Sequence, residues 1–466
     1  MKLAKIEITN FRCFEALSIP LRPDVNVFVG VNGAGKTSIL DAIAIALYDI
    51  VAANDGGGKR QRGWQNATLR PSDIHMLPGT GDPVARRKEF VQFRAQASDF
   101  YEVPGFPAKT TKGESAFIEW TDHIQFQPPN GFAYDTSQSE RLSSIYQYCS
   151  MLWQELKKTE GRALISFPVV AYYRATRRVA RMPELGDVFS LSMDRAGAFK
   201  QALNAGADYR AMCQWFYLRE NRELREKMQA RKDPDYEFPD LKAVRRALCK
   251  TLENVDRVFF EDNPPTLKAV LRNSAGSSSE MALEQLSDGY RNLLAVVLDF
   301  ARRLAQAHPN WDKPLEAPGI LLIDEVELHL HPGWQQTVIP NLRAAFPNTQ
   351  LILATHSPQV LTTVSKEQVQ VLTTAHTLSP LPSDVGTYGA ESSRVLEEIF
   401  GVHSRPKNIE TVGKLQRYLA MVEEQQQDAD EGRQLRNELS AALGTSDPDL
   451  ISADMRISQL KVLRQK

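Results

Sequence analysis

Residues 30–37 read GVNGAGKT, which matches the pattern GxxxxGK[ST]. An apolar run, VNVFV at 25–29, comes directly before this stretch, and the run SILDAIAIAL at 38–47 follows it as a helix. A strand that ends in a glycine-rich turn and leads into a helix is the context in which this pattern binds phosphate groups. The sequence therefore predicts a P-loop and an α/β fold class.

The residues of this turn have separate expected roles. Glycines allow backbone N–H groups to point inward around phosphates, and the dipole of the following helix favours negative charge. Lys36 should reach the β- and γ-phosphates, and Thr37 should hold Mg²⁺. ATP and Mg²⁺ are therefore the expected cofactors. The nucleotide contacts are expected from Asn32, Gly33, Gly35, Lys36, Thr37 and Ser38.

A second apolar run, GILLIDE at 319–325, ends in two carboxylates. A run that is apolar throughout is typical of a parallel strand that is buried on both faces. Asp324 would bind Mg²⁺ through water, and Glu325 would polarise the attacking water as a general base. Alone, the stretch is also compatible with an ordinary strand that has an acidic end. Beside the P-loop, it predicts a metal residue, Asp324, and a catalytic residue, Glu325.

A third motif, LSDGY at 286–290, precedes the helical run RNLLAVVLDFARRLA at 291–305, which in turn precedes the Asp-Glu strand. By itself Ser-Asp-Gly is common turn chemistry. In this position it resembles the signature motif of ABC-type ATPases. The resemblance implies that Ser287 and Gly289 contact the γ-phosphate bound by the opposite subunit of a dimer. A serine hydroxyl at a helix N-terminus is well suited to an anion.

Three further stretches resemble RecF-like and SMC-like members of this group. NFRCF at 10–14 is similar to their N-terminal motif, which implies that Arg12 approaches the phosphates. In ATHSP at 354–358, the resemblance gives His356 a catalytic role at the γ-phosphate or the water. EVELHLHP at 325–332 resembles a dimer-contact loop, and a metal pair is the alternative for its two histidines. AYYRATR at 171–177 also has a counterpart, without a defined role.

Together these resemblances imply an ABC-type P-loop ATPase head, and the long separation of the P-loop from the signature motif indicates an inserted helical arm, followed by a helical C-terminal tail. We expect residues 1–189 to form the N-terminal part of the head, with an irregular insert at 52–165 that is rich in turn residues. Residues 190–264 are expected to be a helical insertion, residues 265–400 the C-terminal part of the head, and residues 401–466 a helical tail. The arm lacks sustained heptads and should be short.

The tail indicates which members of this group of ATPases the chain resembles. The stretch from YGAESS at 388–393 to Arg405-Pro406 resembles OLD-like ATPases, which continue into a Toprim nuclease. Residues 401–466 are too few for such a domain, so we expect no intrinsic nuclease. The chain resembles PtuA, the ATPase subunit of Septu antiphage systems. That resemblance implies a regulatory ATPase in a homo-oligomer of head dimers, with a separate HNH nuclease, PtuB-like, as partner.

Apolar residues of the tail share helical faces that must be buried against the head, another subunit or a partner. They are Leu415, Tyr418, Leu419 and Val422, followed by a repeat of Leu435, Leu439 and Leu443, with Gly444 as the helix cap.

Composition restricts the partners and the compartment. The chain has 466 residues and a net charge of -1, so any nucleic-acid surface must be a local patch. Basic clusters at 59–62 and 174–181 leave nucleic acid open as a partner, and a solvated loop is the alternative for the first cluster. Four scattered cysteines and the absence of an apolar leader favour the cytoplasm. The run IALYDIVAA at 45–53 contains Asp49 and is too short for a membrane span, so no membrane contact is expected.

Two other functions remain open at this point. One is a RecF-like DNA-repair ATPase that acts directly on DNA, and the other is a nucleotide-binding scaffold with little hydrolysis. Intact carboxylates at Asp324 and Glu325 argue against the scaffold.

Overall fold

The computed structural model forms two compact units, Met1–Ser392 and Ser393–Lys466. The residues that the structure describes are 1–54, 69–76, 88–110, 115–127, 131–134, 143–161, 164–175, 193–204, 209–229, 236–252, 254–262, 265–273 and 276–464. The basic cluster at 59–62, and residues 176–181 of the other cluster, lie outside the described residues.

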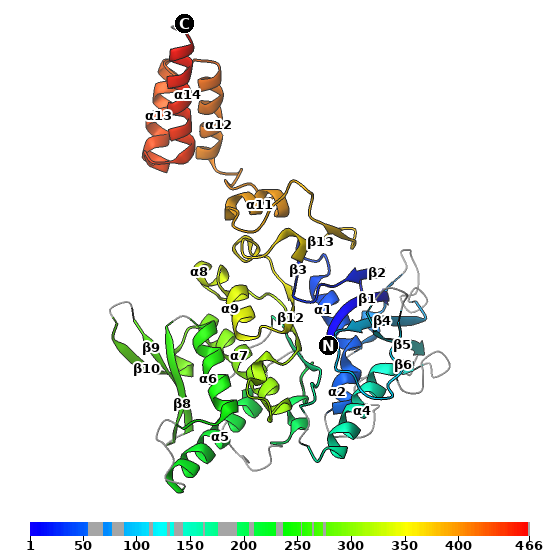
Figure 1. The fold of residues 1–466 in the computed structure, drawn as a ribbon. Coiled ribbons are helices and arrows are strands. Elements are labelled where there is room, and N and C mark those ends of the chain that lie inside the picture. Colours follow the sequence, from blue (N-terminus) through cyan, green and yellow to red (C-terminus); the bar gives the residue numbers. More distant parts are fainter. Residues whose placement is uncertain are drawn as a thin grey trace. The chain divides into compact units, whose positions relative to one another are not determined.

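A six-stranded sheet forms the centre of the first unit (Figure 1). Its order is β14-β13-β3-β12-β11-β7, and every neighbouring pair is parallel except β13 and β14. The strands are β3 (Val25–Val29), β7 (Val169–Tyr173), β11 (Gly319–Ile323), β12 (Thr349–Ala354), β13 (Val369–Leu372) and β14 (Leu378–Pro380). All residues of β3, β7, β11 and β12 are buried, which explains their continuous apolar runs. Because these strands are parallel, their carboxyl ends meet at one edge.

The segment 52–165 was expected to be an irregular insert, but it contributes three strands to a five-stranded antiparallel sheet. Its order is β2-β1-β4-β5-β6, with β1 (Lys2–Phe11), β2 (Phe14–Pro20), β4 (Phe90–Ser98), β5 (Ile118–Gln127) and β6 (Gly131–Tyr134). Strand β4 reads FVQFRAQAS, with Val91, Phe93, Ala95 and Ala97 buried in alternation. This period of two builds a half-buried strand, and glycine- and proline-rich loops around it had favoured an irregular reading. Helix α4 (Ser144–Lys158) completes the segment.

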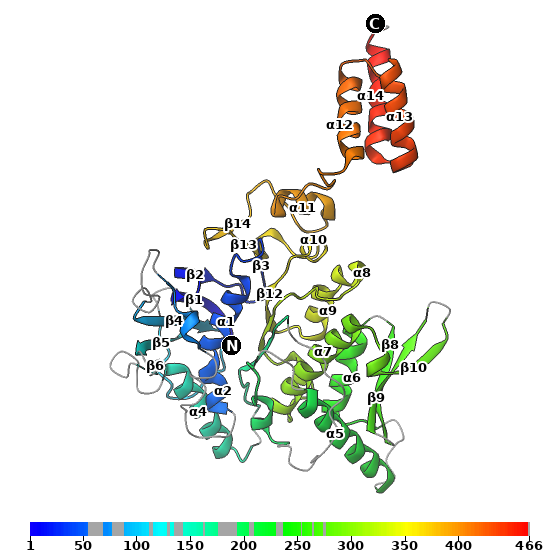
Figure 2. The ribbon, with the colours of Figure 1, turned by 180° about the vertical axis from the view of Figure 1, so that it is seen from behind.

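The arm is only partly helical. Helices α5 (Tyr209–Gln229) and α6 (Pro239–Thr251) are present as expected, but an antiparallel sheet follows them. Its strands are β8 (Val255–Asp262), β9 (Pro265–Arg272) and β10 (Ser278–Ala282). Both ribbon views show this sheet and α5 on the side of the unit away from β4–β6 (Figures 1 and 2).

Helices cover both faces of the six-stranded sheet. Besides those already given, the first unit contains α1 (Lys36–Ala46), α2 (Tyr48–Asn54), α7 (Asp288–Ala307), α8 (Pro332–Gln335), α9 (Val338–Ala345) and α10 (Pro358–Leu361). Consecutive residues of β7 point to opposite faces. Tyr172 bonds Asp41 on α1, and Tyr173 bonds Asp299 on α7, so α1 and α7 pack on opposite sides.

The apolar segment after the P-loop is a core helix pair. Lys36–Asn54 has the length and hydropathy of a membrane span, so the expectation that this region is too short for one is wrong. However, 78% of its most apolar window is buried inside the protein. Its hydropathy therefore reflects packing in the head, because α1 is buried on nearly every side.

His308, at the end of α7, joins that helix to the segment before β7 and should make the head sensitive to acid. Its Nε2 accepts from the Phe167 N–H at 3.1 Å, and its Nδ1 lies 3.0 Å from the Leu304 carbonyl oxygen. Only a neutral ring satisfies both bonds. Burial lowers the pKa of His308 to about 4. The unfolded chain takes up this proton near pH 6.5 while the folded chain resists it, so stability should fall between about pH 6.5 and 4.

The expected loss from His308 is about 1.4 kcal/mol per pH unit, or roughly 3 kcal/mol over this window. We expect the unfolding midpoint of the wild type to fall more steeply with acid than that of His308→Gln, because glutamine supplies a donor and an acceptor but does not titrate. Thermal unfolding between pH 7.5 and 4.5 measures the difference. If the unfolding midpoints of the two proteins fall equally with acid, His308 is not the source of the acid sensitivity.

The second unit contains α11 (Ser392–Phe400, whose first residue belongs to the first unit) and a three-helix bundle of α12 (Glu410–Glu423), α13 (Asp430–Leu443) and α14 (Pro448–Arg464). Gly444 caps α13 as predicted, with a φ of 87°. The apolar faces of α12 and α13 pack against each other and against α14, whose Leu450 and Ala453 are buried with them. These faces are therefore covered within the tail itself, which corrects the expectation that they need the head, another subunit or a partner.

Candidate nucleotide site

The turn between β3 and α1 keeps a shape that requires glycine. Gly35 has a φ of 112°, and a Cβ there would collide with the side chains of Cys13 and Phe14. Gly30 has a φ of 151°, and a Cβ there would overlap the carbonyl oxygen of Leu372 on β13. The His376 ring approaches the Ala34 carbonyl oxygen at 2.8 Å and so supports the turn from outside. The compact turn leaves the N-terminus of α1 open toward an anion.

Lys36 and Thr37 at the start of α1 face the end of β11. The Lys36 Nζ donates to the carbonyl oxygens of Gly30 at 2.8 Å and Val31 at 3.1 Å. The Thr37 Oγ1 donates to the Asp324 Oδ2 at 2.8 Å. Burial lowers the pKa of Lys36, although the nearby Asp324 carboxylate acts in the opposite direction. The P-loop and the Asp-Glu stretch thus meet at the carboxyl edge of the sheet, 287 residues apart in sequence.

Glu325 leaves strand β11 with an unusual backbone. Its φ is 46°, in the left-handed region that non-glycine residues rarely adopt. The backbone N–H of Asp324 donates to the Tyr173 carbonyl oxygen at 2.9 Å, which continues the pairing of β11 with β7 up to this point. A left-handed residue here turns the chain sharply, so the Glu325 side chain lines the same cavity as Lys36.

His356 is held at the cavity by a carboxylate that the sequence reading had assigned only to a contact loop. The Glu327 carboxylate accepts from the His356 backbone N–H and from the Thr355 hydroxyl, both at 2.7 Å. Burial lowers the pKa of His356, and the Lys36 charge lowers it further. The neutral ring is therefore favoured near pH 7, which leaves one nitrogen able to donate and the other able to accept.

These side chains enclose one cavity of about 380 Å³. It is lined by Arg12, Cys13, Asn32, Gly33, Gly35, Lys36, Thr37, Ser38, Asp324, Glu325 and His356. Every residue that the sequence singled out for the nucleotide, metal or catalysis is present, with two exceptions. Ser287 and Gly289 do not line this cavity.

The signature motif instead begins α7 at an outward-facing position. Ser287 is exposed, and its Oγ accepts from the Tyr290 N–H at 3.5 Å as the helix cap. Gly289 is buried, and a Cβ there would overlap the His329 carbonyl oxygen in the loop after β11. The signature motif and the loop after β11 are thus packed together, while the Ser287 hydroxyl stays accessible. The His331 ring accepts from the Gly333 N–H at 3.2 Å and caps α8.

Arg12 reaches the cavity from the end of β1 and is fixed by two carboxylates that sequence reasoning missed. Its Nη1 pairs with Asp41 at 2.6 Å, and its Nε pairs with Asp73 at 2.9 Å. The Ser38 Oγ lies 3.4 Å from the same Nη1. Asp41 lies one helical turn after Thr37 on an otherwise apolar helix, a signal that could have identified it.

The AYYRATR stretch joins the two helices that carry the site motifs. The Tyr172 hydroxyl and the Arg174 Nε both donate to Asp41 on α1, at 2.7 and 2.9 Å. The Tyr173 hydroxyl donates to Asp299 on α7 at 2.8 Å. Asp299 is fully buried with two arginines of its own helix, so removal of one partner would leave an uncompensated buried charge. Arg177 lies outside the described residues.

The oxygen ligands at the cavity are suited to Mg²⁺. The Thr37 hydroxyl and the Asp324 carboxylate already converge, and both are hard oxygen donors. In phosphoryl-transfer sites Mg²⁺ takes one or two protein oxygens and completes its shell with phosphates and water. Across the described ranges, no group of three or more His, Cys, Asp and Glu side chains could hold a metal ion. Thr37 and Asp324 are therefore the residues that would hold Mg²⁺ together with the nucleotide.

The site combines three features. A P-loop precedes the buried helix α1, two carboxylates follow β11, and a histidine follows β12, which lies between β3 and β11 in the sheet. Together they define a P-loop ATPase. Residues 5–255 match the family model described as AAA domain, and the chain belongs to this family. A second AAA-domain model matches residues 199–362.

The relatives that match this chain differ in how much of it they cover. "Retron Ec83 probable ATPase" of Escherichia coli is 26% identical over 514 residues, covering 98% of this chain and 87% of that protein. "Septu protein PtuA" of Bacillus mycoides (strain KBAB4) is 36% identical over 115 residues, covering only 24% of this chain and 16% of that protein. The PtuA resemblance is therefore partial, and likeness over the full length is found with the retron ATPase. Among solved structures, an SMC head bound to the C-winged helix domain of ScpA is 16% identical with a TM-score of 0.43, covering 80% of this chain and 94% of that chain.

Proposed function

We propose that this chain binds ATP with Mg²⁺ in the P-loop cavity and hydrolyses it, as the regulatory subunit of a defence complex. The observation that carries the ATPase proposal is the convergence of Lys36, Thr37, Asp324, Glu325 and His356 around one cavity. They come from three parallel strand ends, and together they supply every group that phosphoryl transfer to water requires.

Each side chain has a distinct part in this chemistry. Lys36 leaves its loop carbonyls to neutralise the β- and γ-phosphate oxygens, as its folded-back position allows. Thr37 and Asp324 hold Mg²⁺, which supplies charge neutralisation at the phosphates when bound. Glu325 takes the proton of the attacking water. Neutral His356 donates a hydrogen bond to the γ-phosphate or to that water.

A dimer of heads completes the site. Ser287 is exposed and absent from its own cavity, so its hydroxyl and the N-terminus of α7 are free to meet an anion held by a second copy. A two-fold arrangement would then create two equal sites, each with Lys36 from one copy and Ser287 from the other. This supports a homo-oligomer built from head dimers.

The cellular role is proposed from the relatives. Full-length likeness to a retron ATPase and local likeness to a Septu protein favour antiphage defence over RecF-like repair. In the Septu group that the sequence resembles, the nuclease is a separate HNH protein. We therefore propose that ATP turnover by this chain controls a separate HNH nuclease. The cytoplasm is the proposed location, because all four cysteines are unpaired, as in a reducing compartment.

The helical bundle of the second unit is the proposed contact for that nuclease, because its helices have a core of their own and contribute nothing to the nucleotide cavity. Purified chain should leave DNA uncut, whereas co-expression with the HNH protein encoded beside it should give a stable complex that cleaves. Truncation after Pro406 should weaken that complex but leave ATP binding unchanged. Co-purification and cleavage assays measure both effects.

A catalytically inactive HNH variant is the control for contaminating nucleases, and it should assemble without cutting. Metal-dependent cleavage by the isolated chain after rigorous purification would contradict a separate nuclease. An intact complex after truncation would contradict the assigned contact.

A further inference from the structure

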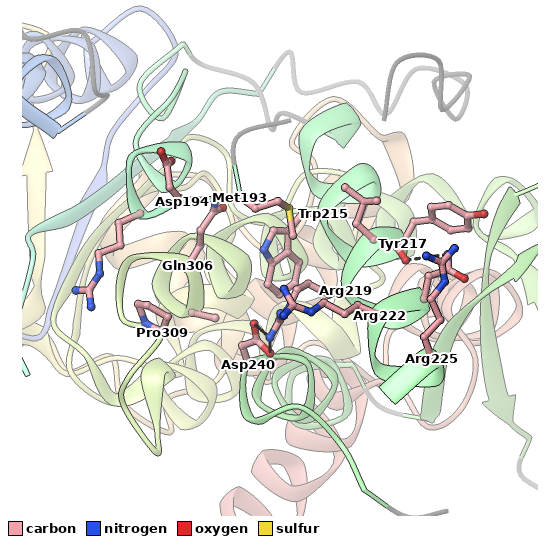
Figure 3. Close-up of a pocket in the computed structure, with 14 residues that line it drawn as sticks. Met193, Asp194, Trp215, Tyr217, Arg219, Arg222, Arg225, Asp240, Gln306 and Pro309 are labelled. Atoms are coloured by element: carbon pink, nitrogen blue, oxygen red, sulfur yellow. Dashed lines mark hydrogen bonds and ion pairs between the residues drawn. The ribbon is translucent and has the colours of Figure 1, made fainter. Parts of the chain in front are cut away.

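A second cavity, of about 920 Å³, lies between the arm and the far end of α7. Its walls come from α5, the start of α6, the turn at Arg195–Ala198 and the last residues of α7. Figure 3 shows Trp215 and Arg219 of α5 on one side, with Gln306 and Pro309 on the other. No residue lines both this cavity and the P-loop cavity. It is therefore a separate site, with a volume at the upper end of that for small-ligand pockets.

The α5 side chains that line this cavity include three arginines and no glutamate, which makes the cavity positive. Glu220 and Glu223 are turned inward and buried, where Arg245 of α6 pairs with them at 2.8 and 3.1 Å. The Glu220 carboxylate also accepts from the Phe260 backbone N–H at 2.8 Å. Glu220 and Glu223 are thus neutralised behind the helix. Its arginines at positions 219, 222 and 225 line the cavity instead.

The positive charge of the cavity exceeds its negative charge. Arg219 pairs with Asp240 at 2.8 Å, and Arg222 pairs with Glu226 at 3.3 Å on the exposed side of the helix. For Arg225 and Arg195, no carboxylate partner occurs among the described residues. Arg195 reaches the Ala307 carbonyl oxygen at 3.3 Å and the Phe167 ring. Burial lowers the pKa of Arg195, and no carboxylate offsets that cost.

The spacing of the arginines suits a chain of phosphates. Residues three apart on a helix rise by about 4.5 Å, so 219, 222 and 225 form a short row of guanidinium groups. Guanidinium forks bind phosphate oxygens in pairs. Beside this row, the exposed side chains of Met193 and Pro309 provide an apolar edge against which a flat base can pack, while Trp215 is buried in the wall. The cavity is too small for a nucleic-acid duplex but has room for one or two nucleotides.

We propose that this cavity binds a nucleoside phosphate, either as a free nucleotide or as the end of a single nucleic-acid strand. The phosphates lie along Arg219, Arg222 and Arg225, and the base packs against Met193 and Pro309. The floor of the site is formed by Ala305 and Gln306, at the opposite end of α7 from Ser287. A 20-residue helix is about 30 Å long, so the ligand is held well away from the exposed Ser287 at the other end of one rigid element.

The test uses the full chain with Lys36→Ala, so that the P-loop cavity contributes little binding. The probe is a fluorescent, 5′-phosphorylated two-nucleotide DNA, and anisotropy reports binding at several salt concentrations. Arg222→Gln/Arg225→Gln should weaken binding roughly tenfold or more and flatten its salt dependence, because two phosphate contacts are lost. The control is Arg343→Gln/Arg433→Gln, which removes the same charge from exposed arginines outside the cavity and should bind like the parent.

Competition identifies the source of the ligand. Equal displacement by AMP and by the unlabelled dinucleotide supports a free nucleotide, whereas displacement that improves with strand length supports a nucleic-acid end. Unchanged unfolding midpoints show that both double variants are folded. The proposal is overturned if no phosphate probe binds the Lys36→Ala protein, if the cavity variant binds as tightly as the control, or if only a glutamate-rich peptide binds.

Discussion

The Glu325→Gln protein is expected to retain ATP and to lose turnover. Glutamine keeps the size of the side chain at the cavity but removes the base that accepts the proton of the attacking water. General-base catalysis contributes on the order of 100-fold or more, so steady-state phosphate release should fall by at least that factor. ATP binding should persist, because Lys36 and the loop glycines are unchanged. Equilibrium binding and phosphate release, measured on the same preparation, separate the two effects.

A matched control is Glu284→Gln, which removes an exposed carboxylate from the turn before the signature motif. It should hydrolyse ATP like the wild type. Turnover by Glu325→Gln at the wild-type rate would show that another group is the base, and His356 would then be the next residue to replace.

Two inactive variants should restore activity when they are mixed. Lys36→Ala should weaken ATP binding roughly 10- to 100-fold, because a hydrogen-bonded charge at the phosphates is lost. Ser287→Arg should keep the cavity of its own chain but block that of its partner, because Ser287 is exposed and outside that cavity. Random mixing gives half mixed dimers with one intact site each, so roughly a quarter of the wild-type rate should return.

The matched control mixes Lys36→Ala with Glu325→Gln. Both residues line the cavity of one chain, so a mixed dimer has no intact site and should stay inactive. ATP binding is measured alongside, because turnover that requires both sites together would hide recovery while binding still returned. If subunit exchange is proven and neither binding nor turnover recovers, a site shared between copies is contradicted.

The parts of the head that the sequence predicted are those with local signals. Strands β3 and β11 were predicted from their apolar runs at 25–29 and 319–325, and the P-loop and the two carboxylates follow these runs directly. Parallel strands bring their carboxyl ends together, so identifying the strands was enough to place the motifs at one edge.

The partners of Arg12 could not be predicted in this way. Asp73 is 61 residues from Arg12, and the Tyr172–Asp41 bond joins residues 131 apart, so no local period links them. The antiparallel sheet within 52–165 was missed for a different reason. Strand β4 is half-buried, and its short alternation is a weaker signal than the turn residues around it. In the tail, the periodicity predicted the helices but could not tell which surface covers them.

We expect one cavity, built from the P-loop and from the ends of β11 and β12, to hydrolyse ATP. The most direct test is the release of inorganic phosphate from ATP by the purified chain with Mg²⁺, compared with Lys36→Ala and with the wild type in EDTA. We expect release by the wild type with Mg²⁺ and little in the other two reactions, because each lacks a group that neutralises the phosphates. Equal release by the wild type and Lys36→Ala would contradict it.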